Sequence, residues 1–181
     1  YDQLIRELAD GNPRLETATA PMLRARASLR QELAGLERLV RQMAQDDPVC
    51  RRLMSMPGVG AVVALTYRSA VDDPSRFRSS KQVGAWVGMT PSRNQSGERD
   101  VSGGITMAGD VDLRRALGQA ATVMMHRGRS TWLRTWGAQV ARRRGSKRAM
   151  VALARRMSVI LHRMWVDDAD FRSDLAWPHE A

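Results

Sequence analysis

The sequence predicts an all-α protein with one long coiled-coil helix followed by a compact helical domain. Apolar residues recur at alternating spacings of three and four in the first quarter of the chain, as in a helix with a narrow apolar seam. Shorter apolar segments separated by Gly, Pro, Asp and Ser follow, as in a set of packed helices. The 181 residues are 43% apolar, which suffices for a hydrophobic core.

Residues 1–46 are predicted to form a helical arm. A short helix in residues 1–13 ends at a Gly-Asn-Pro turn, and a long helix spans about residues 15–44. Arg26 interrupts the seam of this long helix. The seam can pack on a second copy of the chain or fold back on the rest of the chain, and we favour dimerisation. Its apolar members are Met22, Leu29, Leu33, Leu36, Val40 and Met43.

A helix-hairpin-helix element is expected next. A helix over about residues 49–56, which Asp47 can cap, runs into Pro57-Gly58-Val59-Gly60 and then into an apolar helix from Ala61. Glycines let backbone approach a phosphate closely, and the first N–H groups of the second helix can bind anions. Gly58 and Gly60 are therefore predicted to contact DNA, although a simple chain reversal would also use glycine.

Residues 91–104 are predicted to be a polar, Gly-rich and Arg-rich loop, and we take them as the centre of the chemistry. Within this loop Ser96 lies between Arg93 and Arg99. A serine hydroxyl flanked by cations suits attack on a phosphodiester, because the cations stabilise the negative charge that develops. Ser102 is a second candidate nucleophile.

The helix after this loop, over about residues 110–126, begins with Asp110 as its cap and carries two arginines near its first turn. Arginine at a helix N-terminus opposes the helix dipole. Arg114 and Arg115 are therefore predicted to contact phosphate or the transition state.

The charge of the chain predicts a polyanionic partner. There are 29 Lys and Arg residues against 19 Asp and Glu, a formal net charge of +10. Much of this charge gathers in the last two helices, about residues 131–143 and the helix after Gly145, interleaved with apolar residues. A solvated basic face is the alternative, but DNA binding is favoured. The basic residues predicted to bind DNA are Lys81, which precedes these helices, and Arg142, Arg143, Arg144, Lys147, Arg148 and Arg155.

Several classes of site are not expected in this chain. Cys50 is the one cysteine, so neither a disulfide framework nor a multi-cysteine metal site can form. The acidic residues lie mostly at predicted helix ends, and the three histidines are far apart, so no metal site is expected. No membrane segment or signal peptide is expected, which favours a cytoplasmic protein. Because the chain starts at Tyr1, we expect it to be part of something longer.

An ordered set of motifs resembles the C-terminal serine domain of the insertion-sequence transposases that carry a RuvC-like N-terminal domain and use a bridge RNA as guide. The resemblance covers about residues 47–171. Its motifs are Met56-Pro57-Gly58-Val59-Gly60, Arg76-Phe77 with Gln82, Gly88-Met89-Thr90-Pro91, Gln95-Ser96-Gly97, Gly104-Ile105-Thr106 with Gly109, and Leu113-Arg114-Arg115-Ala116-Leu117. Where many relatives have a basic residue after the Gly-Ile-Ser/Thr turn, this chain has Met107.

The resemblance implies a DNA strand-exchange enzyme in which Ser96 forms a transient phosphoserine link. It implies further that magnesium belongs to the RuvC-like domain, which this chain lacks, and that DNA and a structured guide RNA are partners. Residues 47–171 are then the catalytic domain and 172–181 a tail, and the chain alone is not expected to be active. The alternative is a non-catalytic module for nucleic-acid binding and oligomerisation.

Overall fold

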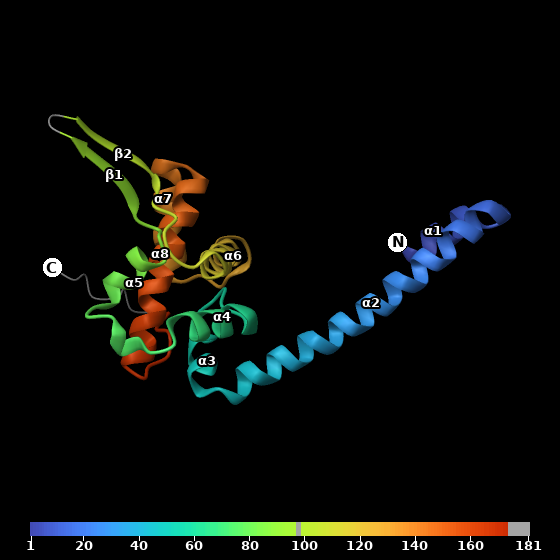
Figure 1. Ribbon diagram of the computed structural model, residues 1–181, viewed down its shortest axis with the longest axis horizontal. Helices are drawn as coiled ribbons and strands as arrows, with labels where there is room; N and C mark the ends of the chain where they lie inside the picture. The colour runs from blue at the N-terminus through green and yellow to red at the C-terminus, as the bar shows by residue number, and fades with distance from the viewer. Residues whose placement is uncertain (97–98, 174–181) are drawn as a thin grey trace. The chain divides into compact units, whose positions relative to one another are not determined.

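A computed structural model describes residues 1–96 and 99–173, and for residues 93–96 and 99–102 it describes the backbone alone. The chain divides into two units, Tyr1–Gln42 and Met43–Ala181, which we treat separately and call the arm and the compact unit. Helices dominate both units, and the described residues include one two-stranded sheet (Figure 1). The predicted all-α fold class is therefore confirmed. No helix in the described part of the chain is both long enough and apolar enough to cross a bilayer.

The arm consists of α1 (Asp2–Ala9) and α2 (Pro13–Asp46), so the predicted long helix is confirmed. Helix α2 begins slightly earlier than the apolar pattern indicates, because the Asn12 side chain accepts hydrogen bonds from the backbone N–H groups of Arg14 and Leu15. Pro13 then occupies the first helical position, which suits its fixed φ angle.

Arg26, the polar interruption of the seam, has partners within the arm. Its guanidinium group forms an ion pair with Asp2 and lies over the ring of Tyr1, 4.7 Å from the ring centroid. Near this contact Ala9 of α1 and Leu23 of α2 are both buried. Arg26 thus holds α1 on α2 and leaves the rest of the seam uncovered.

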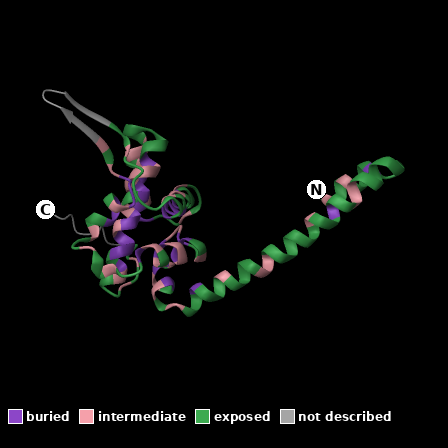
Figure 2. Cartoon of the chain, in the orientation of Figure 1, coloured by how far each residue is buried: buried purple, intermediate pink, exposed green. Residues whose placement is uncertain are grey.

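The apolar seam of α2 is largely open to solvent in the single chain (Figure 2). Leu29 is 70% exposed and Leu36 is 60% exposed, whereas leucines in a folded domain are usually buried. Met22, Leu33, Leu39 and Met43 are exposed as well.

The compact unit is built around its last helix, α8 (Ser146–Val166). This helix packs against several others and has most of its apolar residues buried (Figures 1 and 2). The remaining elements are α3 (Pro48–Leu53), α4 (Ala61–Val71), the short 3-10 helix η1 (Pro74–Arg76), α5 (Ser80–Trp86), α6 (Val111–Arg127) and α7 (Trp132–Arg144).

Side-chain caps fix several helix starts. Asp47 accepts a hydrogen bond from the Cys50 N–H at 2.8 Å, and Asp110 accepts one from the Leu113 N–H at 2.7 Å, as the sequence predicted. For α7 the cap is Thr131, whose hydroxyl accepts a hydrogen bond from the Arg134 N–H. Each such cap stabilises its helix by about 1 kcal/mol.

Among the polar side chains buried in the compact unit, those of Tyr67 and His162 have hydrogen-bond partners on distant elements. The Tyr67 hydroxyl donates to the Ser158 carbonyl at 2.7 Å. In His162, Nε2 lies 3.0 Å from the Pro74 carbonyl oxygen and Nδ1 lies 2.9 Å from Ser80 Oγ. A carbonyl oxygen only accepts hydrogen bonds, so Nε2 carries the proton. This pairing joins η1, α5 and α8 across the core.

Cys50 lies in the core of the compact unit, and Trp86 is partly buried against it. Cys50 is fully buried, and burial, with smaller contributions from Asp47, raises the pKa of its thiol to about 11. Trp86 packs against the core with its ring edge-on to Phe77, at a centroid distance of 5.3 Å.

Residues 91–104, predicted to be a loop, instead form most of a β-hairpin. Strand β1 (Pro91–Ser96) pairs antiparallel with β2 (Arg99–Ile105). The segment lacks the alternation of apolar and polar residues that identifies a half-buried strand. These strands hydrogen-bond only to each other in the described residues, so no apolar face is needed and the pattern gives no strand signal.

Candidate functional site

The base of the hairpin is held by a close crossing of two backbone segments. Gly88, at the end of α5, and Gly109, before α6, both have positive φ angles, 77° and 93°. A Cβ atom at Gly88 would lie 1.9 Å from the Ala108 carbonyl oxygen, and one at Gly109 would lie 2.1 Å from that of Trp86. Only glycine therefore fits at these two positions.

Hydrogen bonds complete this crossing. The Thr106 N–H donates to the Thr90 carbonyl at 2.9 Å, and the Met107 N–H donates to the Gly88 carbonyl at 3.1 Å. These contacts fix the base of the hairpin to the helices of the compact unit.

Arg114 locks the same crossing. Its Nη1 atom lies 3.0 Å from the carbonyl oxygen of Val87, 3.1 Å from that of Ala108 and 3.1 Å from that of Gly109. The sequence predicted that Arg114 contacts phosphate or the transition state, and that contact stays a prediction, but its Nη1 atom also has a structural role at this crossing. We assign it to fixing the hairpin. Arg115 is exposed and, among the described residues, forms an ion pair with Asp112 at 3.2 Å, and its phosphate contact also stays a prediction.

The hairpin bends close to its base. Pro91 lies opposite Ile105 and Arg93 lies opposite Ser102, so β2 has one more residue than β1 in this interval. Such a β-bulge increases the twist and bends the strand. The Ser92 hydroxyl donates to the Gly104 carbonyl at 3.1 Å within the bulge.

The proposed nucleophile lies at the end of β1 farthest from the base. The backbone register places Ser96 opposite Arg99 and Arg93 opposite Ser102. All four predicted residues therefore belong to one hairpin. Their side chains lie outside the described residues, and so does Gly97.

Gly58 and Gly60 lie between α3 and α4 and differ in their surroundings. A Cβ atom at Gly58 would lie 2.5 Å from the Ala120 carbonyl oxygen of α6, so Gly58 permits close packing of this turn on α6. Gly60 caps α4 without a side chain and has open space around it. Both DNA contacts stay predictions, but the structure gives Gly58 a packing role of its own.

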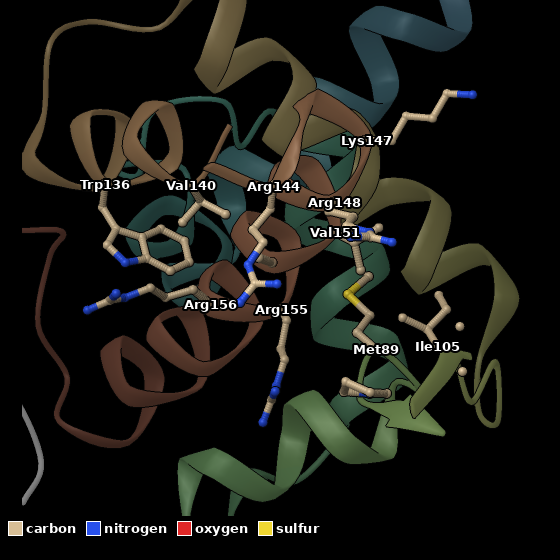
Figure 3. A pocket seen from close by; sticks show the side chains of 14 residues that line it. Met89, Ile105, Trp136, Val140, Arg144, Lys147, Arg148, Val151, Arg155 and Arg156 are labelled. Atoms are coloured by element: carbon tan, nitrogen blue, oxygen red, sulfur yellow. The ribbon is translucent and has the colours of Figure 1, made fainter. Parts of the chain in front are cut away.

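A pocket of about 920 Å³ lies between the base of the hairpin and helices α7 and α8 (Figure 3). Its volume is within the range of about 300–1,000 Å³ typical of ligand sites. Four residues of the predicted basic set line it, namely Arg144, Lys147, Arg148 and Arg155. Arg142 and Arg143, at the end of α7, are exposed outside it, and Lys81 lies on α5.

Two residues of the pocket, Arg156 and Trp136, were not among those predicted from the sequence. The guanidinium carbon of Arg156 lies 4.5 Å from the Trp136 ring centroid and 5.2 Å from that of Trp132. Phe171 stacks on the other tryptophan of this group, Trp132, at 6.3 Å. Burial lowers the pKa of Arg156, but arginine stays charged at neutral pH. Because Trp136 and Arg156 are 20 residues apart in the sequence, no local pattern joins them.

The described residues do not form a metal centre. Nowhere among them do three or more His, Cys, Asp or Glu side chains gather where they could hold an ion. Asp47, Asp73 and Asp110 instead cap helices. Hydrogen bonds from Ser75 lower the pKa of Asp73, as expected for a capping carboxylate.

Comparison with known proteins finds that this chain is similar to several transposases. The chain is 31% identical over 137 residues to the transposase for insertion sequence element IS1111A of Coxiella burnetii, covering 72% of this chain and 36% of the relative. It is 32% identical over 97 residues to the transposase for IS1328 of Yersinia enterocolitica, with 54% and 29% covered. A family 20 transposase of Pseudomonas aeruginosa is 29% identical over 136 residues, with 74% and 40% covered. These relatives are transposases of insertion sequences or of a named transposase family.

A model of one transposase family also matches part of the chain. Residues 50–136 match the model of the transposase family IS116/IS110/IS902. This segment includes the crossing, the hairpin with Ser96 and helix α6. Together the family model and the relatives show that this chain is similar to transposases of the IS116/IS110/IS902 family. The chain spans about two-fifths or less of the length of these curated relatives.

Proposed function

We propose that this chain is the serine-bearing part of a DNA transposase, and that Ser96 is the nucleophile that attacks a DNA phosphodiester. The observation that carries the proposal is the fixed hairpin. The segment that matches the transposase family places Ser96 on a hairpin whose base is held by two glycines and by Arg114. The adjoining pocket supplies the positive charge that a DNA strand requires.

In each step of the proposed reaction, one bond from phosphorus to oxygen forms while another breaks, so no phosphate is lost to hydrolysis. Oγ of Ser96 forms a bond to phosphorus while the bond from phosphorus to one deoxyribose oxygen breaks. The serine proton passes to a base, and the departing oxygen takes up a proton to become a free hydroxyl end. In the second step the hydroxyl end of another strand attacks the phosphoserine, which releases Ser96 and joins the strands. Arg93 and Arg99, the neighbours of Ser96 on the hairpin, are proposed to stabilise the negative charge of each transition state.

Further components are proposed to come from outside this chain. The resemblance implies magnesium held by a RuvC-like domain, and the described residues of this chain do not fit such an ion. We therefore derive no step through magnesium. A structured guide RNA is proposed to select the DNA.

The nucleophile is tested with the full-length protein, its guide RNA, and donor and target DNA. Denaturing gels should show a covalent protein–DNA adduct with the wild type and with Ser102→Ala, and none with Ser96→Ala. An adduct that persists in Ser96→Ala but not in Ser102→Ala would show that Ser102, and not Ser96, is the nucleophile.

The second candidate function is a non-catalytic module that binds nucleic acid and oligomerises. The exposed seam of α2 favours its oligomerisation part, since an apolar stripe on a long helix is usually covered by a partner helix. We propose that two copies pair through this seam, in either function.

Pairing and nucleic-acid binding have separate tests. Sedimentation should give a dimer for the wild type and a monomer for the double variant Leu29→Glu with Leu36→Glu. A wild-type protein that stays monomeric at high concentration would contradict pairing through the seam. Affinity for duplex DNA should fall with salt at a log–log slope of roughly 0.9 per neutralised phosphate. A flat slope would contradict both functions.

A further inference from the structure

The pocket at the base of the hairpin combines two kinds of lining that a simple phosphate-binding surface does not need. Cationic side chains come from the end of α7 and from α8, and apolar side chains come from both the hairpin base and the two helices. Figure 3 shows Arg144 directed toward Arg155 and Arg156, while Lys147 extends away from them. The apolar walls include Met89, Ile105, Trp136, Val140, Val151 and Ala152.

Among the described residues, no acidic side chain neutralises the cations of the pocket. None of its lining residues that the structure describes is acidic. Within the described part of the chain, the ion pairs involve other arginines, such as Arg52 and Arg163. Like charges held this close repel each other in the free protein, so an anion in the pocket would relieve the repulsion.

The start of α8 adds to this positive potential. Helix α8 has 21 residues, begins after Gly145 without a side-chain cap and has no acidic residue in its first turn. Its first N–H groups and the dipole of the helix therefore favour a negative group nearby. Lys147 and Arg148 lie in this same turn.

The position of Arg155 is set by packing on α5. A Cβ atom at Gly84 would lie 2.9 Å from Arg155 Cγ, so the aliphatic part of Arg155 lies directly on the α5 backbone. Its guanidinium group remains exposed at the pocket. Trp136 is likewise held, by the Arg156 guanidinium over its ring. The cationic and aromatic groups are thus arranged before any ligand binds.

We propose that this pocket receives an unpaired nucleotide of a nucleic-acid strand. Its base lies among the apolar walls, and its flanking phosphates lie at Arg144, Arg148 and Arg155. Bases offer flat apolar faces, and single-strand sites in proteins combine stacking surfaces with a cationic groove. The inference rests on the proposed function, because it assumes that nucleic acid is the ligand. It adds that the strand must have a base free of pairing where it passes the hairpin.

The test uses the full-length protein and fluorescent duplexes of identical length and charge. One duplex is fully paired, a second carries one unpaired nucleotide in its centre, and a third carries an abasic residue at that position. The three are made in both DNA and RNA. The duplex with the unpaired base should bind about fivefold or more tightly than the other two, since stacking of one base contributes about 1–3 kcal/mol. A stronger preference in one sugar series identifies the natural strand.

Two pairs of variants locate this preference. Val151→Trp fills the pocket without changing its charge and should remove the preference, whereas Val166→Trp, at an exposed position of the same helix, should keep it. Arg148→Ala should reduce the preference and the affinity, whereas Arg142→Ala, outside the pocket, should weaken all duplexes alike. Thermal unfolding checks that each variant is folded.

Equal binding of the abasic and base-containing duplexes in both series would overturn the proposal, and so would a preference that survives Val151→Trp. These outcomes are independent of the nucleophile. An adduct that requires Ser96 without a preference for the unpaired base rejects the pocket alone. The preference without a Ser96 adduct rejects the proposed chemistry alone.

Discussion

Leucines of the arm and of the compact unit have opposite environments. Leu36 on α2 is 60% exposed, whereas Leu117 on α6 is fully buried. Helix α6 meets α4, α7 and α8, so its apolar face is covered within the chain. The seam of α2 is a narrow stripe along 34 residues, and within the arm α1 meets α2 through the contacts of Arg26.

The difference shows what each apolar pattern can specify. A broad apolar face with its partners encoded nearby in the chain forms a core in a single molecule. A stripe with a seven-residue repeat is complementary to a copy of itself, so it stabilises an assembly and contributes little to a lone chain.

Truncating one leucine in each unit tests the contrast directly. Leu117→Ala should lower the free energy of unfolding by about 2–5 kcal/mol, because it leaves a cavity in a closed core. Leu36→Ala should change it by less than about 0.5 kcal/mol in dilute, monomeric protein. Denaturant unfolding measures both, and a similar loss for the two variants would show that the arm is covered within one chain.

A methyl group added to one glycine in each unit should act in opposite directions. Gly109→Ala should destabilise the compact unit by about 3 kcal/mol, because its φ is positive and the new Cβ would meet the Trp86 carbonyl. Gly35→Ala on α2, where the nearest atom is 3.9 Å away, should stabilise its helix by up to about 1 kcal/mol. Thermal unfolding followed by circular dichroism measures the changes. If Gly109→Ala and Gly35→Ala changed the thermal stability alike, Gly109 would not lie at a close backbone crossing.

Neighbouring arginines provide the next comparison. Arg114→Met should cost about 1–3 kcal/mol and speed hydrogen exchange at the Thr106 and Met107 amides, because three carbonyl groups lose their donor. Arg115→Met loses only an exposed ion pair with Asp112 and should cost less than about 0.5 kcal/mol. Unchanged exchange in Arg114→Met would mean that the hairpin base does not depend on it.

Alkaline pH should give the smallest effect. The folded-state pKa of Cys50 is about 11, above the ordinary value of 9.0, so the thiol stabilises the fold fully below pH 9 and less as pH rises through 11. This corresponds to about 1 kcal/mol lost between pH 9 and 10. Unfolding at both pH values should show a loss in the wild type that exceeds the loss in Cys50→Ala by about this amount, because the variant retains the other titrating groups. Identical slopes would contradict a buried thiol.

Helices with strong caps and repeats were predictable from the sequence. The Asp47 and Asp110 caps and the seam of α2 each depend on residues close together in the chain. The hairpin was missed because β1 and β2 pair with each other and need no alternating apolar face. Its location could be predicted, as a Gly-rich segment around Ser96, but its strand character could not.

The pocket was only half predictable, for a related reason. Charge is visible in the sequence, so Arg144, Lys147, Arg148 and Arg155 were identified. Their arrangement around an apolar hollow depends on the hairpin base, which lies far from α8 in the chain, and on how α7 packs against α8. Arg114 illustrates the converse, since its three carbonyl partners come from the crossing and give no sequence signal.

The most direct test of the central claim is to find the residue that carries DNA after the covalent step. Trypsin cleaves after Arg93 and Arg99 and after Arg114, so it separates Ser96, in the peptide 94–99, from Ser102, in the peptide 100–114. The adduct of the full-length protein is digested with nuclease and trypsin and analysed by mass spectrometry. We predict a nucleotide remnant on peptide 94–99. A remnant on peptide 100–114, or on any peptide without Ser96, would contradict the account.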